Sequence, residues 1–289
     1  MCGEAELSST PALSRGTVDR NAFLREDQAG LDLAWDTGLV LVLDDQGRCL
    51  VDGTDLLLLT SADAPAGDRL YLGMDGEQHF FAVRAELPRR LGAQPKVLRD
   101  IGHLLGDRDA GLLVHATGLA NWHTAHPRCA RCGAPTEAAR GGSVRRCTAD
   151  GSEHFPRTDP AMIVLVTDGA DRAVLGRQAI WPAGRYSTLA GFVEPGESAE
   201  QAVVREVFEE TGLSVREVRY VSSQPWPMPA SLMLGFTAVV DGDAEPVARD
   251  GELEDARWFT KDELRDGTSM LPTPVSIAYL LITRWLSET

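Results

Sequence analysis

The chain has 289 residues, of which 43% are hydrophobic and 25% are charged. This is the composition of a globular protein that is long enough for more than one domain. The net charge of −15 argues against nonspecific binding to nucleic acid, which depends on cationic contacts to phosphates. We find no run of about eighteen apolar residues, and the acidic N-terminus lacks the basic start of a signal peptide. We therefore expect a cytoplasmic protein that does not enter a membrane.

Residues 1–125 are expected to form an N-terminal α+β domain, in which residues 1 to about 30 are polar and loosely ordered. Apolar runs between Asp- and Gly-rich turns predict strands at Gly38–Leu43, Asp55–Thr60 and Gln78–Arg84. The apolar spacing over Val97–His123 predicts helix, which Gly106 and Gly111 could divide.

Residues 126–158 contain the spacing of a small zinc module. Cys129-Ala-Arg-Cys132 is followed, after fourteen residues, by Cys147. Zinc ribbons pair two Cys-x-x-Cys knuckles, but the fourth position here is Asp150. A carboxylate can bind Zn²⁺, so Asp150 is the first candidate for the fourth ligand and His154 is its rival. The alternative is a metal-free turn, and a disulfide is disfavoured because nothing marks the chain as secreted.

The remaining cysteines, Cys2 and Cys49, are interpreted as a tail thiol and a strand residue without function. The same module is basic within an acidic protein. Its six arginines and three acidic residues give a net charge of +3, the arginines being residues 128, 131, 140, 145, 146 and 157. This surface could meet a phosphate chain or pair with acidic neighbours, and we favour the pairing.

Residues 159–289 are expected to form a C-terminal domain. Its predicted strands and closing helix are Met162–Val166, Ala173–Gly176, Leu232–Val240 and, for the helix, Pro274–Leu286. Between them lies Gly191-Phe-Val-Glu-Pro-Gly-Glu197, which is followed by Arg205-Glu-Val-Phe-Glu-Glu-Thr-Gly-Leu213. Ser198 and Gln201 fit a capping box, so a helix is expected to begin there, and Gly212 is expected to end it.

Three carboxylates share one face of this helix, because Glu206, Glu209 and Glu210 stand at i, i+3 and i+4. Like charges at this spacing repel one another, and oxygen ligands suit Mg²⁺ or Mn²⁺. A solvated acidic face is the plain alternative, but the glycines, the cap and Arg205 all favour a metal site.

The segment Gly191–Leu213 resembles the Nudix box, and every fixed position matches. The resemblance implies an α/β/α sandwich and metal-dependent hydrolysis of a nucleoside diphosphate linked to another group. It implies that Arg205 orients the carboxylates, with Glu197 as its partner. Glu252 matches a further metal-binding glutamate, for which Glu254 is the rival. Phe192, unless it belongs to the core, matches an aromatic that stacks on a substrate base, and Glu210 and Glu252 are the candidates for the general base.

A second segment, Ser223-Gln-Pro-Trp-Pro-Met-Pro-Ala-Ser231, has three prolines in five residues. Proline excludes helix and central strand, so a rigid loop that presents Gln224, Trp226 and Ser231 is expected. The segment resembles the array that follows the box in NADH pyrophosphatases, in which phenylalanine stands at the position of Met228. Methionine is also apolar and adaptable, so the loop should persist. Ala278 matches a backbone contact of the same family.

Taken together, these features predict an α+β chain, in which a Nudix sandwich follows a zinc-ribbon-like module and an N-terminal α+β domain. The resemblance implies hydrolysis of NAD(H) to nicotinamide mononucleotide and AMP, which extends to removal of the NAD cap from RNA 5′ ends. It also implies Mg²⁺ or Mn²⁺ at Glu206, Glu209, Glu210 and Glu252, zinc at the cysteines, and a homodimer. The alternatives are a broader hydrolase of ADP-ribose or diadenosine polyphosphates and a non-enzymatic nucleotide sensor.

Overall fold

The computed structural model describes residues 10–249, 251–267 and 269–288. They fold into two compact units. The N-terminal unit consists of residues 13–158 together with residues 226–230, and the C-terminal unit is formed mainly by residues 159–225 and 231–289. The expectation for Cys2, and that for the order of residues 1–9, lie outside the described residues.

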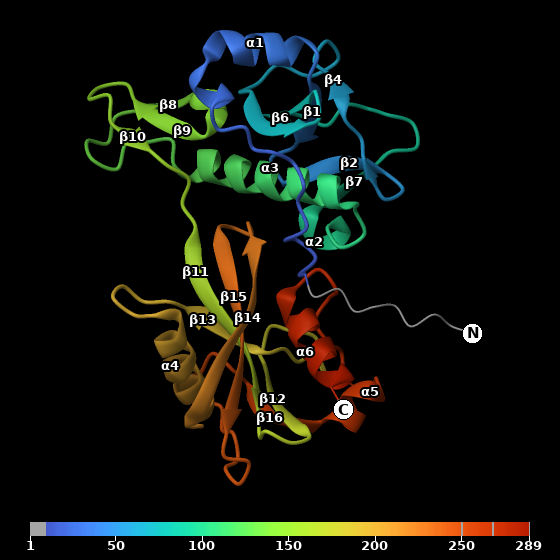
Figure 1. The fold of residues 1–289 in the computed structure, drawn as a ribbon, viewed down its shortest axis with the longest axis vertical. Helices are drawn as coiled ribbons and strands as arrows, with labels where there is room; N and C mark the ends of the chain where they lie inside the picture. Colours follow the sequence, from blue (N-terminus) through green and yellow to red (C-terminus); the bar gives the residue numbers. More distant parts are fainter. Residues whose placement is uncertain (1–9, 250, 268, 289) are drawn as a thin grey trace. The chain divides into compact units, whose positions relative to one another are not determined.

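The N-terminal unit is built on two small sheets, with strand orders β4-β1-β6-β5 and β3-β2-β7 (Figure 1). Its strands are β1 Leu39–Leu43, β2 Arg48–Asp52, β3 Asp55–Leu56, β4 Leu59–Thr60, β5 Leu70–Asp75, β6 Gln78–Arg84 and β7 Gln94–Val97. Its helices are η1 Leu24–Glu26, α1 Gln28–Asp36, α2 Leu98–Ile101 and α3 Asp107–Ala125.

Successive side chains of β6 point to opposite faces of the four-stranded sheet. A helix packs on each of these faces. Phe81 and Val83 pack against Leu31 and Ala34 of α1 in one apolar cluster. Phe80, on the other face, lies under the guanidinium of Arg108 from α3, 5.7 Å from the ring centroid.

The three-stranded ribbon sheet, of order β10-β9-β8, belongs to the same unit. Its elements are β8 Thr136–Ala139, η2 Arg140–Gly142, β9 Val144–Cys147 and β10 Glu153–His154. A buried polar network joins this sheet to α3. Arg145 donates from Nε to Thr136 Oγ1 at 2.6 Å and lies 2.8 Å, through Nη1, from His123 Nδ1. His123 Nε2 lies 2.8 Å from Gly142 O, so a neutral ring with its proton on Nε2 satisfies both contacts.

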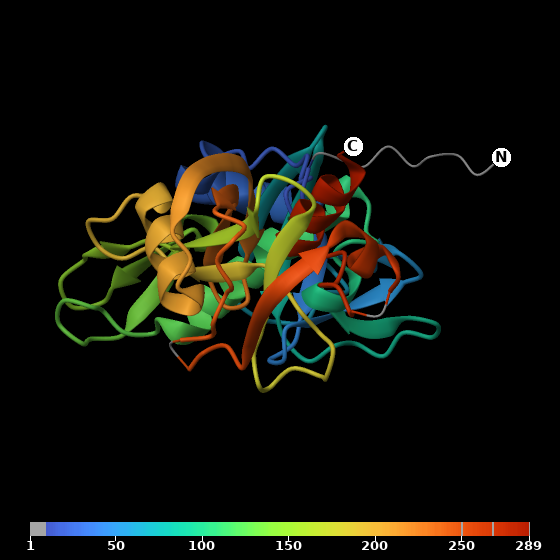
Figure 2. The ribbon, with the colours of Figure 1, turned by 90° about the horizontal axis from the view of Figure 1, so that it is seen from below.

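The C-terminal unit is a six-stranded sheet of order β14-β15-β11-β12-β16, with β13 paired to β11. Its strands are β11 Asp159–Thr167, β12 Arg172–Arg177, β13 Leu189–Phe192, β14 Val215–Trp226, β15 Ser231–Val240 and β16 Asp255–Thr260. Its helices are α4 Ala199–Thr211, α5 Lys261–Arg265 and α6 Ile277–Ser287. Figures 1 and 2 show α4 and α6 on opposite sides of these strands.

The two faces of this sheet form two separate apolar cores. Val203 and Val207 of α4 pack with Phe236 on one face, and Ile282 and Trp285 of α6 pack with Leu165 on the other. This is the expected α/β/α sandwich, in which β11 lies between the layers and carries core residues on both faces.

The element boundaries differ from the predictions in places. Residues 10–30, expected to be loosely ordered, pack into the structure: Leu13 is 2% exposed and Asp19 pairs with Met74. The predicted helix over 97–123 is divided at Gly106, the N-cap of α3, but Gly111 lies inside α3. The predicted strand over 55–60 is two short strands in different sheets, and the closing helix begins at Ile277.

The two adjacent valines of α4 give a matched test of the sandwich. Val203 is 0% exposed and Val204 is 45% exposed. Val203→Ala removes buried methyl groups and leaves a cavity, so we expect it to lower the free energy of unfolding by about 1.5–3 kcal/mol. Val204→Ala should change it by less than about 0.5 kcal/mol. Urea titration of both variants measures the difference, and equal losses would contradict the assigned layers.

Candidate catalytic and metal sites

The carboxylate cluster is built by a turn and the helix α4 that follows it. Ser198 Oγ accepts from Gln201 N at 3.2 Å, and Gln201 Oε1 accepts from Ser198 N at 2.8 Å, so the capping box is complete. Gly212 ends the helix at φ 73°, a left-handed conformation that glycine adopts without steric cost. The ends of α4, and therefore the register of its glutamates, follow from local sequence.

Glycine at position 191 is required by the position of Glu206. A Cβ atom added to Gly191, on β13, would lie 2.0 Å from Oε1 of Glu206. The carboxylate therefore occupies the space that any other side chain at position 191 would fill. Because β13 pairs with β11 through Gly191 and Met162, the sheet itself forms one wall of the cluster.

Arg205 joins the turn to the helix through its whole guanidinium. It binds Glu197 in a bidentate manner, with Nε–Oε1 and Nη2–Oε2 distances of 2.9 Å each. Its Nη1 lies 2.8 Å from Glu206 Oε1 and 3.0 Å from Glu209 Oε2, and Nη2 donates to Phe192 O at 2.9 Å. Such charge-assisted pairs are strong and directional. Arg205 thus holds the carboxylates in place and partly offsets their repulsion.

The electrostatics of the cluster favour the binding of a cation. Burial raises the pKa of Glu206, and the negative charges of Glu209 and Glu252 raise it further, in opposition to Arg205. Glu210, the last of the three helix carboxylates, is 4% exposed. A buried carboxylate that faces like charges is stabilised by a cation. The residues therefore fit hard divalent ions, which take oxygen ligands.

Glu252 and Glu254 differ in the residues with which they interact. The negative charge of Glu252 raises the pKa of Glu206, which indicates that Glu252 lies near the box cluster. Glu254 instead forms an ion pair with Arg177, and its backbone N donates to Arg177 O. The electrostatic influence of Glu252 on Glu206 and the pairing of Glu254 with Arg177 favour Glu252 as the additional ligand.

The residues expected to contact substrate have different environments. Phe192 is 59% exposed, so its ring is available to a ligand. Gln224 is completely buried, and its Nε2 donates to Val275 O at 3.0 Å, which ties β14 to the start of α6. The side chain of Ala278 is buried in the α6 core, and Ser231, at the start of β15, is partly buried.

The proline segment forms less loop than predicted. Strand β14 continues through Gln224 and Pro225 to Trp226, which is possible because β14 is an edge strand. The residues that remain form a tight turn, and residues 226–230 belong to the N-terminal unit.

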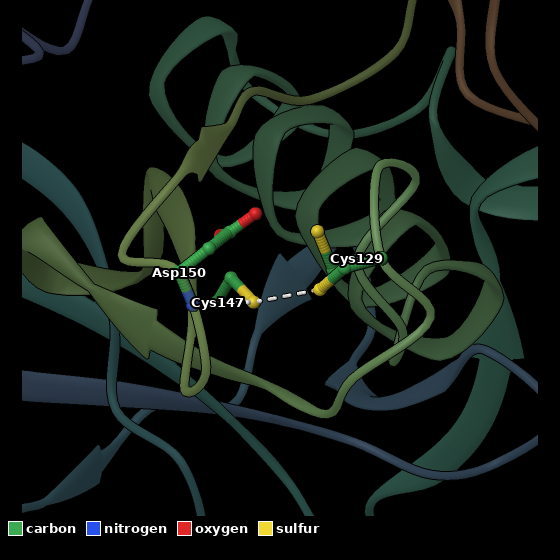
Figure 3. A group of neighbouring side chains, drawn as sticks. Cys129, Cys147 and Asp150 are labelled. Atoms are coloured by element: carbon green, nitrogen blue, oxygen red, sulfur yellow. Dashed lines mark hydrogen bonds between the residues drawn. The ribbon is translucent and has the colours of Figure 1, made fainter.

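The ribbon brings together the predicted zinc ligands. Single ligand atoms of Cys129, Cys132, Cys147 and Asp150 all lie within 4.8 Å of one another. Figure 3 shows Cys129, Cys147 and Asp150 around one small space. Backbone N–H groups of Arg131 and Ala149 each donate to a cysteine sulfur at 3.4 Å, which favours thiolates.

Asp150 and His154 have different relations to this cluster. Ser152 Oγ donates to Asp150 Oδ1 at 2.6 Å and orients the carboxylate, which lies within the cluster. His154 Nε2 lies 3.2 Å from Cys129 Sγ, but His154 lies outside the four-residue group. Three thiolates and one carboxylate form an acceptable tetrahedral zinc set, so the cluster fits structural zinc. The ordering role of Ser152 was not anticipated, since no spacing rule marks a hydroxyl outside the ligand set.

Comparisons with known proteins agree with this organisation. Family models match three consecutive segments: the NADH pyrophosphatase-like rudimentary NUDIX domain at 28–122, the NADH pyrophosphatase zinc ribbon domain at 125–155 and the NUDIX domain at 157–284. NAD-capped RNA hydrolase NudC of Mycobacterium bovis (strain BCG / Pasteur 1173P2) is 43% identical over 300 residues, which cover 97% of this chain and 96% of the relative. The chain belongs to the NudC family of Nudix hydrolases.

Other relatives are similar in part. NAD-capped RNA hydrolase NudC of Stutzerimonas stutzeri is 44% identical over 217 residues, 74% of this chain and 75% of the relative. A crystal structure of a NUDIX hydrolase from Nitrosomonas europaea aligns with a TM-score of 0.46 and 20% identity, over 55% of this chain and 89% of that chain. The matches to the family models confirm the zinc-ribbon and Nudix expectations at the family level. Nudix hydrolases use divalent metals, in agreement with the acidic cluster of this hydrolase.

The close approach of Gly191 and Glu206 can be tested by metal binding. Gly191→Ala would displace the Glu206 carboxylate from Arg205, so we expect the affinity for Mn²⁺ to fall about 10- to 100-fold. The glutamate can swing outward, so the melting temperature should change little. Isothermal titration with Mn²⁺ and thermal unfolding measure the two effects. Mn²⁺ affinity equal to that of the unaltered protein would contradict the idea that Gly191 makes room for the Glu206 carboxylate.

The fourth zinc ligand can be identified by metal content. We expect about one zinc per chain in the purified protein. Asp150→Ala should lose zinc at chelator concentrations that the unaltered protein withstands, because it removes one of four ligands. His154→Ala should retain zinc, since His154 contacts Cys129 from outside the cluster. Mass spectrometry of bound metal compares the two variants, and the reverse order would assign the site to His154.

Proposed function

We propose that this Nudix hydrolase cleaves the pyrophosphate bond of NAD(H) to give nicotinamide mononucleotide and AMP, and that it removes the NAD cap from RNA. The observation that carries this proposal is the assembled box: Arg205 contacts Glu197, Glu206 and Glu209 at 3.0 Å or less. The choice of substrate is supported by 43% identity, over nearly the whole chain, to proteins named NAD-capped RNA hydrolase.

In this proposal Glu206, Glu209, Glu210 and Glu252 hold Mg²⁺ or Mn²⁺. Bound divalent ions neutralise the diphosphate and lower the pKa of water to a range in which it can attack phosphorus. Arg205 acts through the carboxylates that it orients, with Glu197 as the anchor of its guanidinium. The proton of the attacking water passes to Glu210 or Glu252. Glu210 is buried on α4, whereas Glu252 lies on an exposed loop.

The substrate groups are assigned as follows. The exposed ring of Phe192 stacks on a base, and its backbone carbonyl binds Arg205, so the ring is positioned by the box itself. Trp226 and Ser231 contact the dinucleotide, and Ala278 contributes its backbone. Gln224 is buried, and it stabilises this segment through its hydrogen bond to Val275 O.

A broader dinucleotide hydrolase is the second candidate, and Met228 is the observation that favours it. A flexible methionine in the proline segment could accept ADP-ribose or diadenosine polyphosphates. Relative kcat/KM values for these compounds, NADH and NAD⁺ decide between the two. A non-catalytic sensor is disfavoured, because a protein without catalysis has no need to retain every carboxylate that Arg205 orients.

NAD-capped RNA presents the same bond as free NAD, so the same carboxylates serve both substrates. Three of the six ribbon arginines are already engaged: Arg145 is buried in its network, while Arg140 and Arg146 pair with Glu153. We further propose a cytoplasmic homodimer, on the family resemblance. In the described part of the chain, no helix has both the length and the apolarity needed to cross a membrane.

The reaction is tested with NADH and Mg²⁺ or Mn²⁺, with products identified by chromatography and mass. The unaltered protein should release AMP and reduced nicotinamide mononucleotide. Glu210→Gln keeps the size of the side chain and removes its charge, so turnover should fall about 100-fold or more. Glu254→Gln is the matched control, because Glu254 pairs with Arg177 away from the cluster, and it should turn over normally.

Near-normal turnover by Glu210→Gln would refute the metal-site assignment. Intact NADH in the presence of the unaltered protein would refute the substrate and favour the broader dinucleotide panel. The same two proteins are then given NAD-capped RNA. Release of nicotinamide mononucleotide by the unaltered protein supports cap removal. Cleavage of NADH but not of the capped RNA would confine the enzyme to free dinucleotides.

A further inference from the structure

The turn at residues 226–230 lies within the N-terminal unit, although the strands that lead to and from it belong to the C-terminal unit. Alternate positions 225, 227 and 229 are proline, and proline has no backbone N–H. Within the turn, Met228 N donates to Trp226 O at 2.7 Å. The carbonyls of Pro227 and Pro229 are therefore acceptors in a segment that is poor in donors of its own.

Asn121 on α3 supplies donors to both of these carbonyls. Its Nδ2 lies 2.7 Å from Pro227 O and 3.4 Å from Pro229 O. A primary amide carries two N–H groups and no charge, so one side chain can hold two carbonyls of the turn. The contact to Pro227 O is partly buried, which strengthens it relative to a fully solvated surface, whereas the longer contact to Pro229 O is exposed.

The surface of α3 beside Asn121 also packs against the turn. Gly118 lies three residues earlier on the same helix face, and a Cβ added there would lie 3.6 Å from Cβ of Pro227. Pro227 is buried. On the neighbouring helix α2, the guanidinium of Arg99 lies 5.5 Å from the centroid of the Trp226 ring. The turn is thus packed, hydrogen-bonded and covered by residues of one unit.

We propose that Asn121 is a positioning residue for substrate: it fixes the proline turn so that the Trp226 ring has one defined place. This inference rests on the proposed function, because residues 223–231 are assigned there to the dinucleotide. Gln224 anchors the segment before the turn through Val275 O, and Asn121 anchors the turn itself. Trp226 lies between these two anchors. Loss of either hydrogen bond would let the Trp226 ring adopt several positions. This lowers the affinity for substrate and not the rate of the chemical step.

The test uses the full-length protein and the variant Asn121→Asp. Aspartate has nearly the same shape, but its ionised carboxylate has no N–H and would place oxygen against the two carbonyls. We expect KM for NADH to rise about 5- to 30-fold with kcat within twofold. The melting temperature should remain close to that of the unaltered protein. Thr124→Val is the matched control, since Thr124 is exposed on α3 and its Oγ1 bonds to Ala120 O of its own helix.

Hydrogen exchange of peptides that cover residues 223–231 is the second readout, and it needs no substrate. Asn121→Asp should exchange faster there, at Met228 N in particular, while Thr124→Val should not. Unchanged KM, or unchanged exchange in these peptides, would overturn the positioning role. A fall in kcat together with the melting temperature would also overturn it, because that pattern describes a structural residue. If the unaltered protein leaves NADH intact, the proposed function fails, and hydrogen exchange alone decides whether Asn121 holds the turn.

Discussion

The candidate active site depends on one guanidinium. Glu206, Glu209 and Glu210 repel one another on α4, and burial adds to the cost for Glu206. Arg205 opposes this by sharing its nitrogens among Glu197, two helix carboxylates and the carbonyl of Phe192. It thereby connects the turn that carries Glu197, the end of β13 and helix α4. A lysine would place a single ammonium there and could not make the bidentate contact with Glu197.

The rest of the chain supports this site and its substrate segment through buried polar contacts. Gln224 ties the edge strand β14 to the start of α6, and Asn121 ties the proline turn to α3. His123, two residues further along α3, joins that helix to the ribbon through Arg145. Helix α3 is therefore an organising element of the N-terminal unit, since its polar residues contact both the ribbon and the turn.

Local patterns in the sequence predicted much of this structure. The ends of α4 follow from Ser198, Gln201 and Gly212, and the zinc cluster follows from cysteine spacing, because these signals act within a few residues. Long-range contacts left no such signal. Nothing in the helical pattern of residues 97–123 distinguishes Asn121 as a contact for a turn 106 residues away. The burial of Gln224 was missed for the same reason, and so was the packing of Leu13, because a polar neighbourhood concealed its partners.

The division of the chain has a consequence for its modularity. The N-terminal unit is not one continuous stretch, because residues 226–230 are contributed from within the Nudix fold. A catalytic domain cut out at residue 159 would keep every box carboxylate but leave Pro227 and Pro229 without Asn121. Residues 159–289 therefore contain all the box carboxylates, but the contacts that order residues 226–230 also require residues of the N-terminal unit. Recombination at the apparent domain boundary would transfer the box and the proline turn without α3, the helix that we expect to hold the turn in place.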